Sequence, residues 1–528
     1  MFLPWMQPSQ EKYLDFTDSL NDTVELEGIE FRNNVQEGPY GSSDPSESGT
    51  SYRNRREQTL KNIGGSMNRK VVFCAVVCCL LIPGSILAAI GRLDQKDDAT
   101  ISVRVRDSRT GVAIPNARVE IIRERGPRIN SLGSGTVAAT PNENIHITIS
   151  AEKYTGSESQ FVAGPGMLPV TFLLDPIEEP EELRSDVVAA KLDPQKALIH
   201  GHVVDSQTGT PIAGATVRLR EQHVTAKSDQ RGYFSLLAAA LPYNMPDDVP
   251  LRDDIIVEAN DHRTFEILNA FLPQGADTHY IVELQRGSGV DTRDDIHKLQ
   301  RANPYEGDDT RFSDADLPPA EVSAQGLKPV ANSVPLPTNI RLGTNCSCAS
   351  CSSVLVLARG TYVKRGLNDE WIASWHINAL RAGAVAYRSY GCYYAQHPIS
   401  SNYDICNNAC CQVNDSDTST STNQAVDDTS GVVVTRDCAH PAKAYYAAEQ
   451  NHCAGCGNGY AGAPASNWPC ITDMVDINQS CNGHGLGACQ WGTQRHAVNN
   501  GWAWTTIVDH YYYNGGGNRN AKRSNTCP

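Results

Sequence analysis

The sequence predicts a multidomain protein in which two antiparallel β-sandwich domains precede a cysteine-rich α+β domain, with one transmembrane or signal helix near the N-terminus. Three observations lead to this fold class. Alternating strands around an Asp-Ser-x-Thr-Gly turn occur twice, in residues 105–119 and again in residues 203–217. Fourteen of the 17 cysteines lie between residues 346 and 527. Residues 71–90 are uncharged and mainly apolar, and their number is about enough to span a bilayer.

The first 91 residues allow two interpretations. Residues 1–66 are polar with little periodicity, so we expect a disordered tail. Arginines and lysines precede the apolar run, which predicts a cytoplasmic N-terminus and export of the rest of the chain. If translation starts at Met1, the run 71–90 is a membrane anchor. If it starts at Met67, residues 67–91 form a secretory signal peptide and the tail is a mis-called start.

The remaining sequence divides by composition. Two stretches rich in Pro, Asp, Glu and Ala are expected to be linkers, with folded domains on either side of them. The predicted parts are a degenerate first sandwich at 98–176, a linker at 177–197, the second sandwich at 198–286, a linker at 287–338 and the α+β domain at 339–528. The formal net charge of −15 argues against nucleic-acid binding.

The second sandwich carries a family resemblance. After its turn the chain continues with Ser-Asp-Gln-Arg-Gly-Tyr-Phe-Ser-Leu at residues 228–236, which resembles the carboxypeptidase regulatory-like, or transthyretin-like, β-sandwich. The resemblance implies a spacer or a binding module. We therefore expect no catalysis in either sandwich.

The α+β domain begins with a segment that contains a candidate catalytic carboxylate. Residues 377–390 have small and apolar residues at helical spacing, with Arg381 and Arg388 off the apolar face, and predict a helix. Glu370 precedes this helix, between Asn368 and two tryptophans. An indole partly desolvates a neighbouring carboxyl group, which raises its pKa and favours the protonated acid. An ordinary solvated glutamate has the same sequence signature.

Near the C-terminus, residues 483–492 contain four glycines, a histidine and a glutamine. Glycine permits positive φ and close approach of backbone amides to a ligand, so we expect a shaped surface in this segment. The candidate substrate-binding residues are Arg388, Gly483, His484, Gly485, Gly487 and Gln490. His484 can equally fix its own loop, and Arg388 and Gln490 can equally satisfy buried backbone groups.

Together these segments resemble the stage II sporulation protein D (SpoIID) family, which includes the amidase enhancer LytB. Members carry Y-V-K-G-V-L-x-x-E, a helix that ends in A-V-A-A-R-T-Y, and later G-H-G-x-G-M-S-Q-x-G-A and I-L-x-H-Y-Y-x-G. The matching stretches here are 361–390, 425–434, 483–492 and 507–515. The resemblance covers about residues 335–517.

The resemblance implies action on the glycan strands of bacterial peptidoglycan, in better-known members as a lytic transglycosylase. Glu370 occupies the position of the family's catalytic glutamate. One acid suffices, because it protonates the glycosidic oxygen and then, as a base, helps the C6 hydroxyl close onto C1 to leave a 1,6-anhydro sugar. Two other functions stay open: a non-catalytic enhancer or recruiter of a cell-wall amidase, and a disulfide-rich surface adhesion protein. The expected location is the cell envelope, either anchored or secreted.

The sequence departs from the family pattern in two places. The proline two residues after the glutamate is Ile372 here, and a Y-H-S-x-S-G-G stretch is replaced by residues 445–451. Because that stretch lies near the substrate groove in the family, substrate preference is open. Glu449 becomes a second candidate carboxylate, for which the commoner alternative is a solvated loop glutamate.

The even number of distal cysteines predicts disulfides formed in an oxidising compartment. A zinc site competes for some of these thiols. Its candidate ligands are Cys438, His440, Cys453 and Cys456, and Cys346, Cys348 and Cys351 also have a usable spacing. We expect disulfides and no cofactor, with zinc as the alternative.

Overall fold

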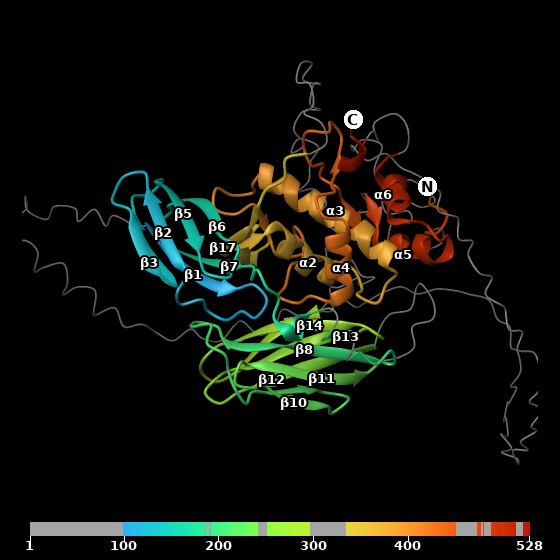
Figure 1. Ribbon diagram of the computed structural model, residues 1–528, viewed down its shortest axis with the longest axis horizontal. Coiled ribbons are helices and arrows are strands. Elements are labelled where there is room, and N and C mark those ends of the chain that lie inside the picture. The colour runs from blue at the N-terminus through green and yellow to red at the C-terminus, as the bar shows by residue number, and fades with distance from the viewer. Residues whose placement is uncertain are drawn as a thin grey trace, which may run out of the picture. The chain divides into compact units, whose positions relative to one another are not determined.

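The computed structural model of the protein describes residues 99–184, 187–188, 192–240, 251–295, 334–449, 473–476, 479, 487–513 and 521–527 (Figure 1). The polar tail, the apolar run at 71–90 and His484 lie outside the described residues. Within the described part, no helix combines the length and the apolar character needed to cross a membrane. The tail, the anchor and the signal peptide therefore stay predictions.

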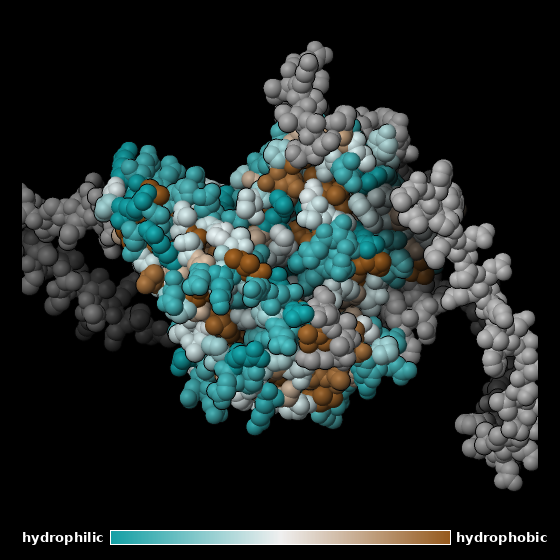
Figure 2. Space-filling view, viewed as in Figure 1, coloured by the Kyte–Doolittle hydropathy of each residue, from teal (hydrophilic) through white to brown (hydrophobic). Residues whose placement is uncertain are grey.

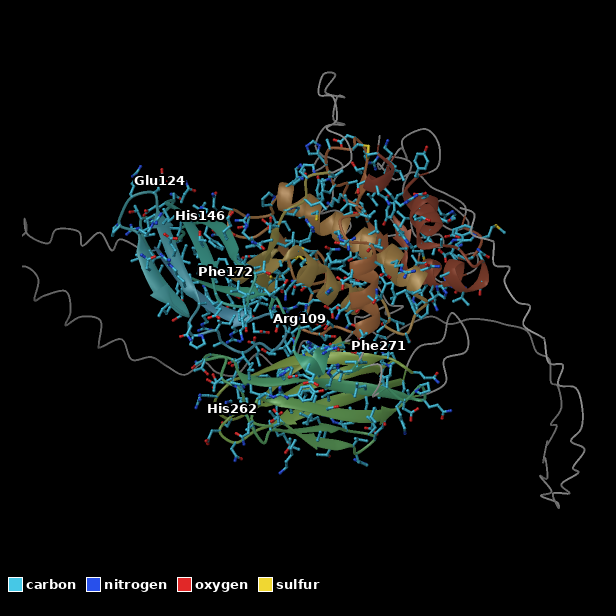
Figure 3. The ribbon with its side chains drawn as sticks, viewed as in Figure 1. Arg109, Glu124, His146, Phe172, His262 and Phe271 are labelled. Atoms are coloured by element: carbon cyan, nitrogen blue, oxygen red, sulfur yellow. A yellow bond between two sulfur atoms is a disulfide. The ribbon has the colours of Figure 1, made fainter. Side chains whose placement is uncertain are left out.

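The first β-sandwich is built by strands whose side chains alternate between buried and exposed. In β5, Ile145, Ile147 and Ile149 are buried and the residues between them are not. Phe172, labelled in Figure 3, meets Phe161 edge to face at a ring-centroid distance of 6.4 Å. The strands are β1 (Ala99–Asp107), β2 (Arg118–Arg123), β3 (Ile129–Leu132), β4 (Ser134–Ala139), β5 (Asn144–Ser150), β6 (Ser157–Val162) and β7 (Gly166–Leu174). One sheet has the order β3-β2-β5-β6, and the other contains β4-β1-β7. A short 3-10 helix (Glu181–Leu183) follows the sandwich.

The second β-sandwich also consists of two sheets, with the orders β10-β9-β12-β13-β15 and β11-β8-β14. Its strands are β8 (Lys196–Asp205), β9 (Thr216–Leu219), β10 (Thr225–Lys227), β11 (Tyr233–Ala239), β12 (Leu251–Glu258), β13 (Thr264–Leu272), β14 (Asp277–Leu284) and β15 (Val290–Asp294). The buried side chains of Phe234, Ile255 and Leu272 belong to one hydrophobic core between the sheets. Strand β15 extends this sandwich into the segment predicted as a linker, 287–338.

The repeated turn has the same hydrogen bonds in both sandwiches. The carboxylate of Asp107 accepts from the backbone N–H groups two and three residues later, at 2.8 Å each, and Asp205 does the same at 3.0 and 2.8 Å. The glycine that closes each turn has positive φ, 71° at Gly111 and 68° at Gly209. The predicted internal repeat is therefore a structural repeat, because an aspartate followed by glycine at this spacing specifies one turn geometry.

The sheets are mixed, and the prediction of purely antiparallel sandwiches is wrong in this respect. Strand β1 pairs in parallel with β7, and β8 pairs in parallel with β14. In each case the last long strand of the sandwich returns beside the first strand and runs in the same direction. This pairing joins residues more than 60 positions apart, and the alternation within a strand does not reveal the direction of its neighbour.

The C-terminal domain combines short strands with five helices among the described residues. Its elements are β16 (Asn339–Ser347), β17 (Ser350–Ala358), α2 (Arg359–Glu370), α3 (Ile377–Gln396), β18 (Ile405–Cys406), α4 (Thr420–Asp428), β19 (Val434–Thr435), β20 (Tyr446–Ala447), β21 (Ala488–Cys489), α5 (Gln490–Asn499), α6 (Trp504–Tyr512), β22 (Lys522–Arg523) and a 3-10 helix (Ser524–Thr526). The predicted α+β character is present, and the helix predicted at 377–390 is α3. Figure 1 shows helices α2 to α6 in yellow to red.

Helices α2 and α3 contact each other closely because glycines leave room for aromatic rings. A Cβ atom on Gly366 would lie 1.9 Å from the Tyr387 ring, and one on Gly383 would lie 2.5 Å from the Trp371 ring. Neither ring is more than 1% exposed. The pair therefore tolerates no side chain at these glycines without a shift of one helix.

Both sandwiches are hydrogen-bonded to the C-terminal domain. Strand β17 pairs in parallel with β7, so that one sheet has the order β18-β16-β17-β7-β1-β4 (Figure 1). From the second sandwich, the Asp277 carboxylate accepts from the Thr420 N–H at 3.0 Å, at the first turn of α4. A negative charge is stabilising at a helix N-terminus. Arg293 of β15 forms an ion pair with Asp417 at 3.2 Å.

On the face shown in Figure 2, hydrophobic residues form separate patches among hydrophilic ones. The exposed large apolar side chains include Leu132, Met167 and Ile177, each about two thirds exposed or more. Scattered apolar residues of this kind are normal on a protein surface.

Three buried histidines lie together in the second sandwich. His200 Nε2 is 3.3 Å from Asp277 Oδ2, and His202 Nδ1 is 3.3 Å from His279 Nε2. Burial lowers the pKa of His202 to about 4, although Glu182 opposes this effect. Burial also places the pKa of His279 well below its ordinary value. The rings of His202 and His279 are therefore neutral in the folded protein at neutral pH.

We expect the protein to lose stability as pH falls from 6.5 towards 4, because the unfolded chain binds protons in this window while folded His202 does not. Between pH 7 and pH 5 the loss for one such histidine is on the order of 2 kcal/mol. Denaturant unfolding followed by circular dichroism at pH 7 and pH 5 measures it. His202→Gln should reduce the loss between the two pH values, and the exposed control His397→Gln should not. Equal pH dependence in His202→Gln and the wild type would contradict the prediction.

Candidate functional site

Glu370 is the last residue of α2, and its partly exposed carboxyl group meets two other segments of the domain. The backbone N–H of Val413 donates to Glu370 Oε1 at 3.1 Å. The side-chain amide of Gln490 donates to the Glu370 backbone oxygen at 2.5 Å and lies 3.3 Å from Oε2. Two segments that are far from α2 in sequence therefore hold the Glu370 carboxyl group.

Gln490 is the first residue of α5 and is 4% exposed. The sequence left two roles open for Gln490, a substrate contact or a hydrogen bond to buried backbone groups. Its hydrogen bond to the Glu370 backbone oxygen supports the second role. Gly487, just before it, has φ of +78°, and a Cβ atom there would lie 1.7 Å from the Tyr445 carbonyl oxygen. Only glycine fits this backbone. The Gly-rich segment thus brings the start of α5 against residues 445–447, where β20 and β21 pair.

Two tyrosines near Glu370 share one glutamine as their hydrogen-bond partner. Gln412 accepts from the Tyr362 hydroxyl at 2.6 Å and donates to the Tyr446 hydroxyl at 2.9 Å. Burial raises the pKa of both phenols, and the negative charge of Glu370 raises them further. The phenols therefore stay protonated at neutral pH, and Glu370 lies close enough to act on them electrostatically.

Disulfides hold the segment that contains Gln412 and Val413. Among the described cysteines the bridges are Cys346–Cys351, Cys348–Cys410, Cys406–Cys411 and Cys438–Cys527. Cys348–Cys410 connects the tip of the β16–β17 hairpin to residues 406–411, directly before the segment that contacts Glu370. Cys346–Cys351 lies within the hairpin and Cys406–Cys411 within the 406–411 segment. The predicted disulfides are confirmed here, and they indicate an oxidising compartment.

The bridge to Cys527 removes Cys438 from the zinc alternative, because a sulfur atom in a disulfide has no thiolate to offer a metal. His440 lies 2.6 Å from the Asp437 carboxylate. Cys453 and Cys456 lie outside the described residues, as do Gly483, His484 and Gly485. The roles expected for these five residues stay predictions.

Glu449 is not the solvated loop glutamate that the sequence favoured. Its side chain is 2% exposed and forms an ion pair with Arg495 at 2.5 Å. Arg495 also lies 2.8 Å from Asp476. Burial and the charge of Asp473 raise the pKa of Asp476 to about 8, and Arg495 opposes this effect. Glu449 therefore serves as the counter-ion of a buried arginine.

Arg388 is buried in α3 and does not lie off the apolar face as predicted. Its guanidinium donates to the carbonyl oxygens of Thr429, Val432 and Val426 at 2.9 to 3.0 Å. These carbonyls belong to the C-terminal end of α4 and the turn after it, where helix carbonyls have no partner within the helix. Arg388 thus has a structural role in place of the expected substrate contact.

Val413 and Gln412 contribute to the site, but no sequence motif identified them. Val413 acts through its backbone N–H, which every residue except proline has. The cysteines at 410 and 411 were the available clue, because each is bridged to another segment or residue and so anchors the residues that follow.

The arrangement defines a multidomain protein whose disulfide-bonded α+β domain holds a single oriented glutamate at its surface. Residues 349–435, which contain Glu370, match the sequence model of the family described as Stage II sporulation protein. The chain therefore carries a domain of that family, as its motifs predicted. This domain links the chain to a function related to the cell wall.

Comparison with the curated proteins finds no match. The solved structures with similarity include the Bacillus anthracis TIE protein, with 14% identity over 36% of this chain and 34% of that chain and a TM-score of 0.13. They also include a streptococcal ancillary pilin, with 13% identity over 37% and 63% of the two chains and a TM-score of 0.12. Catechol 1,2 dioxygenase of Acinetobacter radioresistens has 17% identity over 24% and 62%, with a TM-score of 0.13. In each case the match spans less than two thirds of the other chain, and at these TM-scores the likeness carries no argument.

We expect removal of the Cys348–Cys410 bridge to loosen the segment that holds Glu370. The double variant Cys348→Ser with Cys410→Ser should lose about 2–4 kcal/mol of stability. Amide hydrogen exchange at residues 412–414 should become faster, because the bridge anchors the residues just before them. Removal of Cys438–Cys527 serves as the control and should leave that exchange unchanged. Unchanged exchange at 412–414 in the first variant would show that the bridge does not hold the segment.

We expect Arg495→Met to destabilise the protein by about 3–5 kcal/mol, because it leaves the buried Glu449 carboxylate without its counter-ion. The matched control is Arg381→Met, which removes a partly exposed ion pair with Asp428 and should cost about 1 kcal/mol or less. Denaturant unfolding measures both variants. A similar loss in the two variants would mean that burial of the Arg495 pair has no energetic consequence.

Proposed function

We propose that the α+β domain cleaves the glycan strands of peptidoglycan as a lytic transglycosylase, with Glu370 as its single acid and base. The environment of the Glu370 carboxyl carries the proposal: the group is partly exposed, and Val413 and Gln490 hold it from two sides. The family match at residues 349–435 supports the same role.

The proposed reaction needs one proton that leaves Glu370 and returns to it. Protonated Glu370 gives its proton to the glycosidic oxygen, the bond from that oxygen to C1 breaks, and the leaving sugar departs with a free hydroxyl group. The Glu370 carboxylate then takes the proton of the C6 hydroxyl, whose oxygen bonds to C1. The product is a 1,6-anhydro end, and no water is consumed.

The neighbouring residues support this chemistry by holding the carboxyl group. Gln490 is a positioning residue, because it contacts Glu370 and is itself buried. The Val413 N–H fixes the second carboxyl oxygen. Glu449 takes no part, since Arg495 neutralises it in the interior.

The disulfides and the family domain fit an exported protein of the cell envelope. The proposal includes delivery by the apolar run at 71–90, which serves as a membrane anchor or as part of a cleaved signal peptide. Intact-mass analysis of the native protein separates the two forms.

A second function, as a non-catalytic enhancer or recruiter of a cell-wall amidase, has one specific observation in its favour. Each carboxyl oxygen of Glu370 already lies near a protein donor. A glutamate in such contacts can serve to join α2, the 412–414 segment and α5 without any reaction.

We expect Glu370→Gln to reduce glycan cleavage by a factor of about 10²–10⁴, because the amide keeps the shape of the side chain but cannot donate a proton at neutral pH. Digestion of purified sacculi, with mass analysis of 1,6-anhydro ends, measures the activity. The matched control is Asp427→Asn, which removes a surface carboxylate of the same domain and should leave the rate unchanged. Circular dichroism checks that both variants are folded.

The same assay decides between the two functions. If the wild-type protein binds glycan, releases no anhydro product, and stimulates a purified amidase equally well with Glu370→Gln, the transglycosylase proposal is wrong and the enhancer function replaces it.

A further inference from the structure

Asp473, His496 and His510 bring three possible metal ligands together on the far end of α5 from Glu370. His496 lies in the last turn of α5 and His510 in the last turn of α6. Asp473 precedes a turn at residues 474–475. One ligand atom of each residue lies within 4.8 Å of the other two. Asp473 and His496 are buried, and His510 is 21% exposed at its side chain.

The distances suit ligands that share one cation. Asp473 Oδ1 lies 3.0 Å from His496 Nε2, and Asp473 Oδ2 lies 3.4 Å from His510 Nε2. Zinc bonds to imidazole nitrogen and carboxylate oxygen are about 2.0–2.2 Å long, so ligand atoms around a tetrahedral ion lie roughly 3.3–3.5 Å apart. The two observed separations end on different oxygens of Asp473, so the carboxylate would turn or use both oxygens, and the 3.0 Å separation from His496 would widen to accept an ion.

The Nε2 atom of His510 has room for a closer partner, because its ion-pair contact with Asp473 Oδ2 is 3.4 Å long. This atom is buried and makes no hydrogen bond among the described residues, although it faces the Asp473 carboxylate. The carboxylate already accepts from the Tyr511 hydroxyl at 2.7 Å through Oδ2 and contacts His496 through Oδ1. A buried polar atom without a hydrogen bond is uncommon in native proteins and requires an explanation.

The surroundings hold the His496 ring and the Asp473 carboxylate in place. The His496 ring stacks on Trp502 with ring centroids 4.0 Å apart and planes 4° apart. The other ring nitrogen, Nδ1, lies 3.0 Å from the side-chain amide of Asn500. When that amide turns its oxygen towards the ring, it accepts the Nδ1 proton and leaves Nε2 free to bind a metal, as second-shell groups do in zinc proteins. The Tyr511 hydroxyl orients Asp473 in the same way.

Two other clusters of potential ligands already have cations of their own. Glu449, Asp476 and Cys489 surround Arg495, which pairs with both carboxylates. Of Asp369, Asp415 and Asp417, the last pairs with Arg293 at 3.2 Å. Among the described residues, the ion-pair partners found for Asp473 are the two histidines. A divalent ion would therefore balance the negative charge of Asp473, as arginine side chains balance the other buried carboxylates.

We propose that Asp473, His496 and His510 bind one zinc ion, with water in the remaining coordination position. The ion joins the segment at 473–476 to α5 and α6. Because α5 begins with Gln490, which contacts Glu370, the ion also fixes the helix that orients the candidate catalytic group. The site contains no cysteine and is separate from the cysteine set considered in the sequence. It does not depend on the proposed transglycosylase activity.

The test measures zinc binding to the purified full-length protein with its disulfides intact. After removal of metal with a chelator, the protein is dialysed against micromolar zinc and its metal content is measured by mass spectrometry. We expect one zinc per chain in the wild type, and at least tenfold weaker binding in His510→Gln and in Asp473→Asn. The control His440→Gln, which changes an exposed histidine, should bind zinc as the wild type does.

Two further readouts keep the result decisive if a variant folds poorly. Cobalt in place of zinc should give visible d–d bands without thiolate charge-transfer absorption. Zinc should also raise the unfolding temperature of the wild type but not that of folded His510→Gln. The proposal is overturned if the wild type binds less than about a tenth of an equivalent, or if thiolate absorption appears. It is also overturned if binding persists in both variants but disappears in Cys453→Ser with Cys456→Ser.

Discussion

The candidate site depends on how closely α2 packs against α3. Glu370 ends α2, so any displacement of that helix moves its carboxyl group away from Val413 and Gln490. Gly366 and Gly383 make the close contact possible, because the rings of Tyr387 and Trp371 occupy the space that a Cβ would need. Trp371 also donates to Thr493 of α5 at 3.1 Å, which ties the end of α2 to the helix that begins with Gln490. Glycine–aromatic packing thus sets the geometry of a polar site.

Around this packed pair, polar interactions and disulfides hold the loops, because the strands after β17 are short. Strands β18 to β22 have two residues each, so they contribute few ladder hydrogen bonds. Arg388 satisfies carbonyls at the end of α4, and Arg495 neutralises Glu449 in the interior. Buried groups of this kind cost free energy unless they are paired, and here their pairing fixes the positions of the loops. The disulfides perform the same task for residues 406–411.

The sandwiches take part in this arrangement and are more than spacers. A sheet of the first sandwich continues into the β16–β17 hairpin, whose tip carries Cys348, the cysteine bridged to Cys410. The second sandwich places Asp277 at the N-terminus of α4 and Arg293 beside Asp417. Both contacts reach residues that follow Val413 in the chain. Both sandwiches therefore contact the domain that contains Glu370.

The sequence alone determined the features that local patterns encode. Helical spacing predicted α3, the duplicated aspartate turn predicted the repeat in the two sandwiches, and the motifs around Glu370 identified the family and the candidate acid. Gly487 was recognisable as a residue needed for backbone shape. Each of these depends on residues within one segment, where spacing and conformational preference suffice.

The tertiary structure decided what depends on residues far apart in the chain. It paired the disulfides, set parallel neighbours within the sandwiches, buried Glu449 against Arg495, and turned Arg388 from a candidate ligand contact into a support for α4. It also brought Asp473, His496 and His510 together. No local pattern records such contacts, because they arise only when packing places separate segments side by side and removes their polar groups from water.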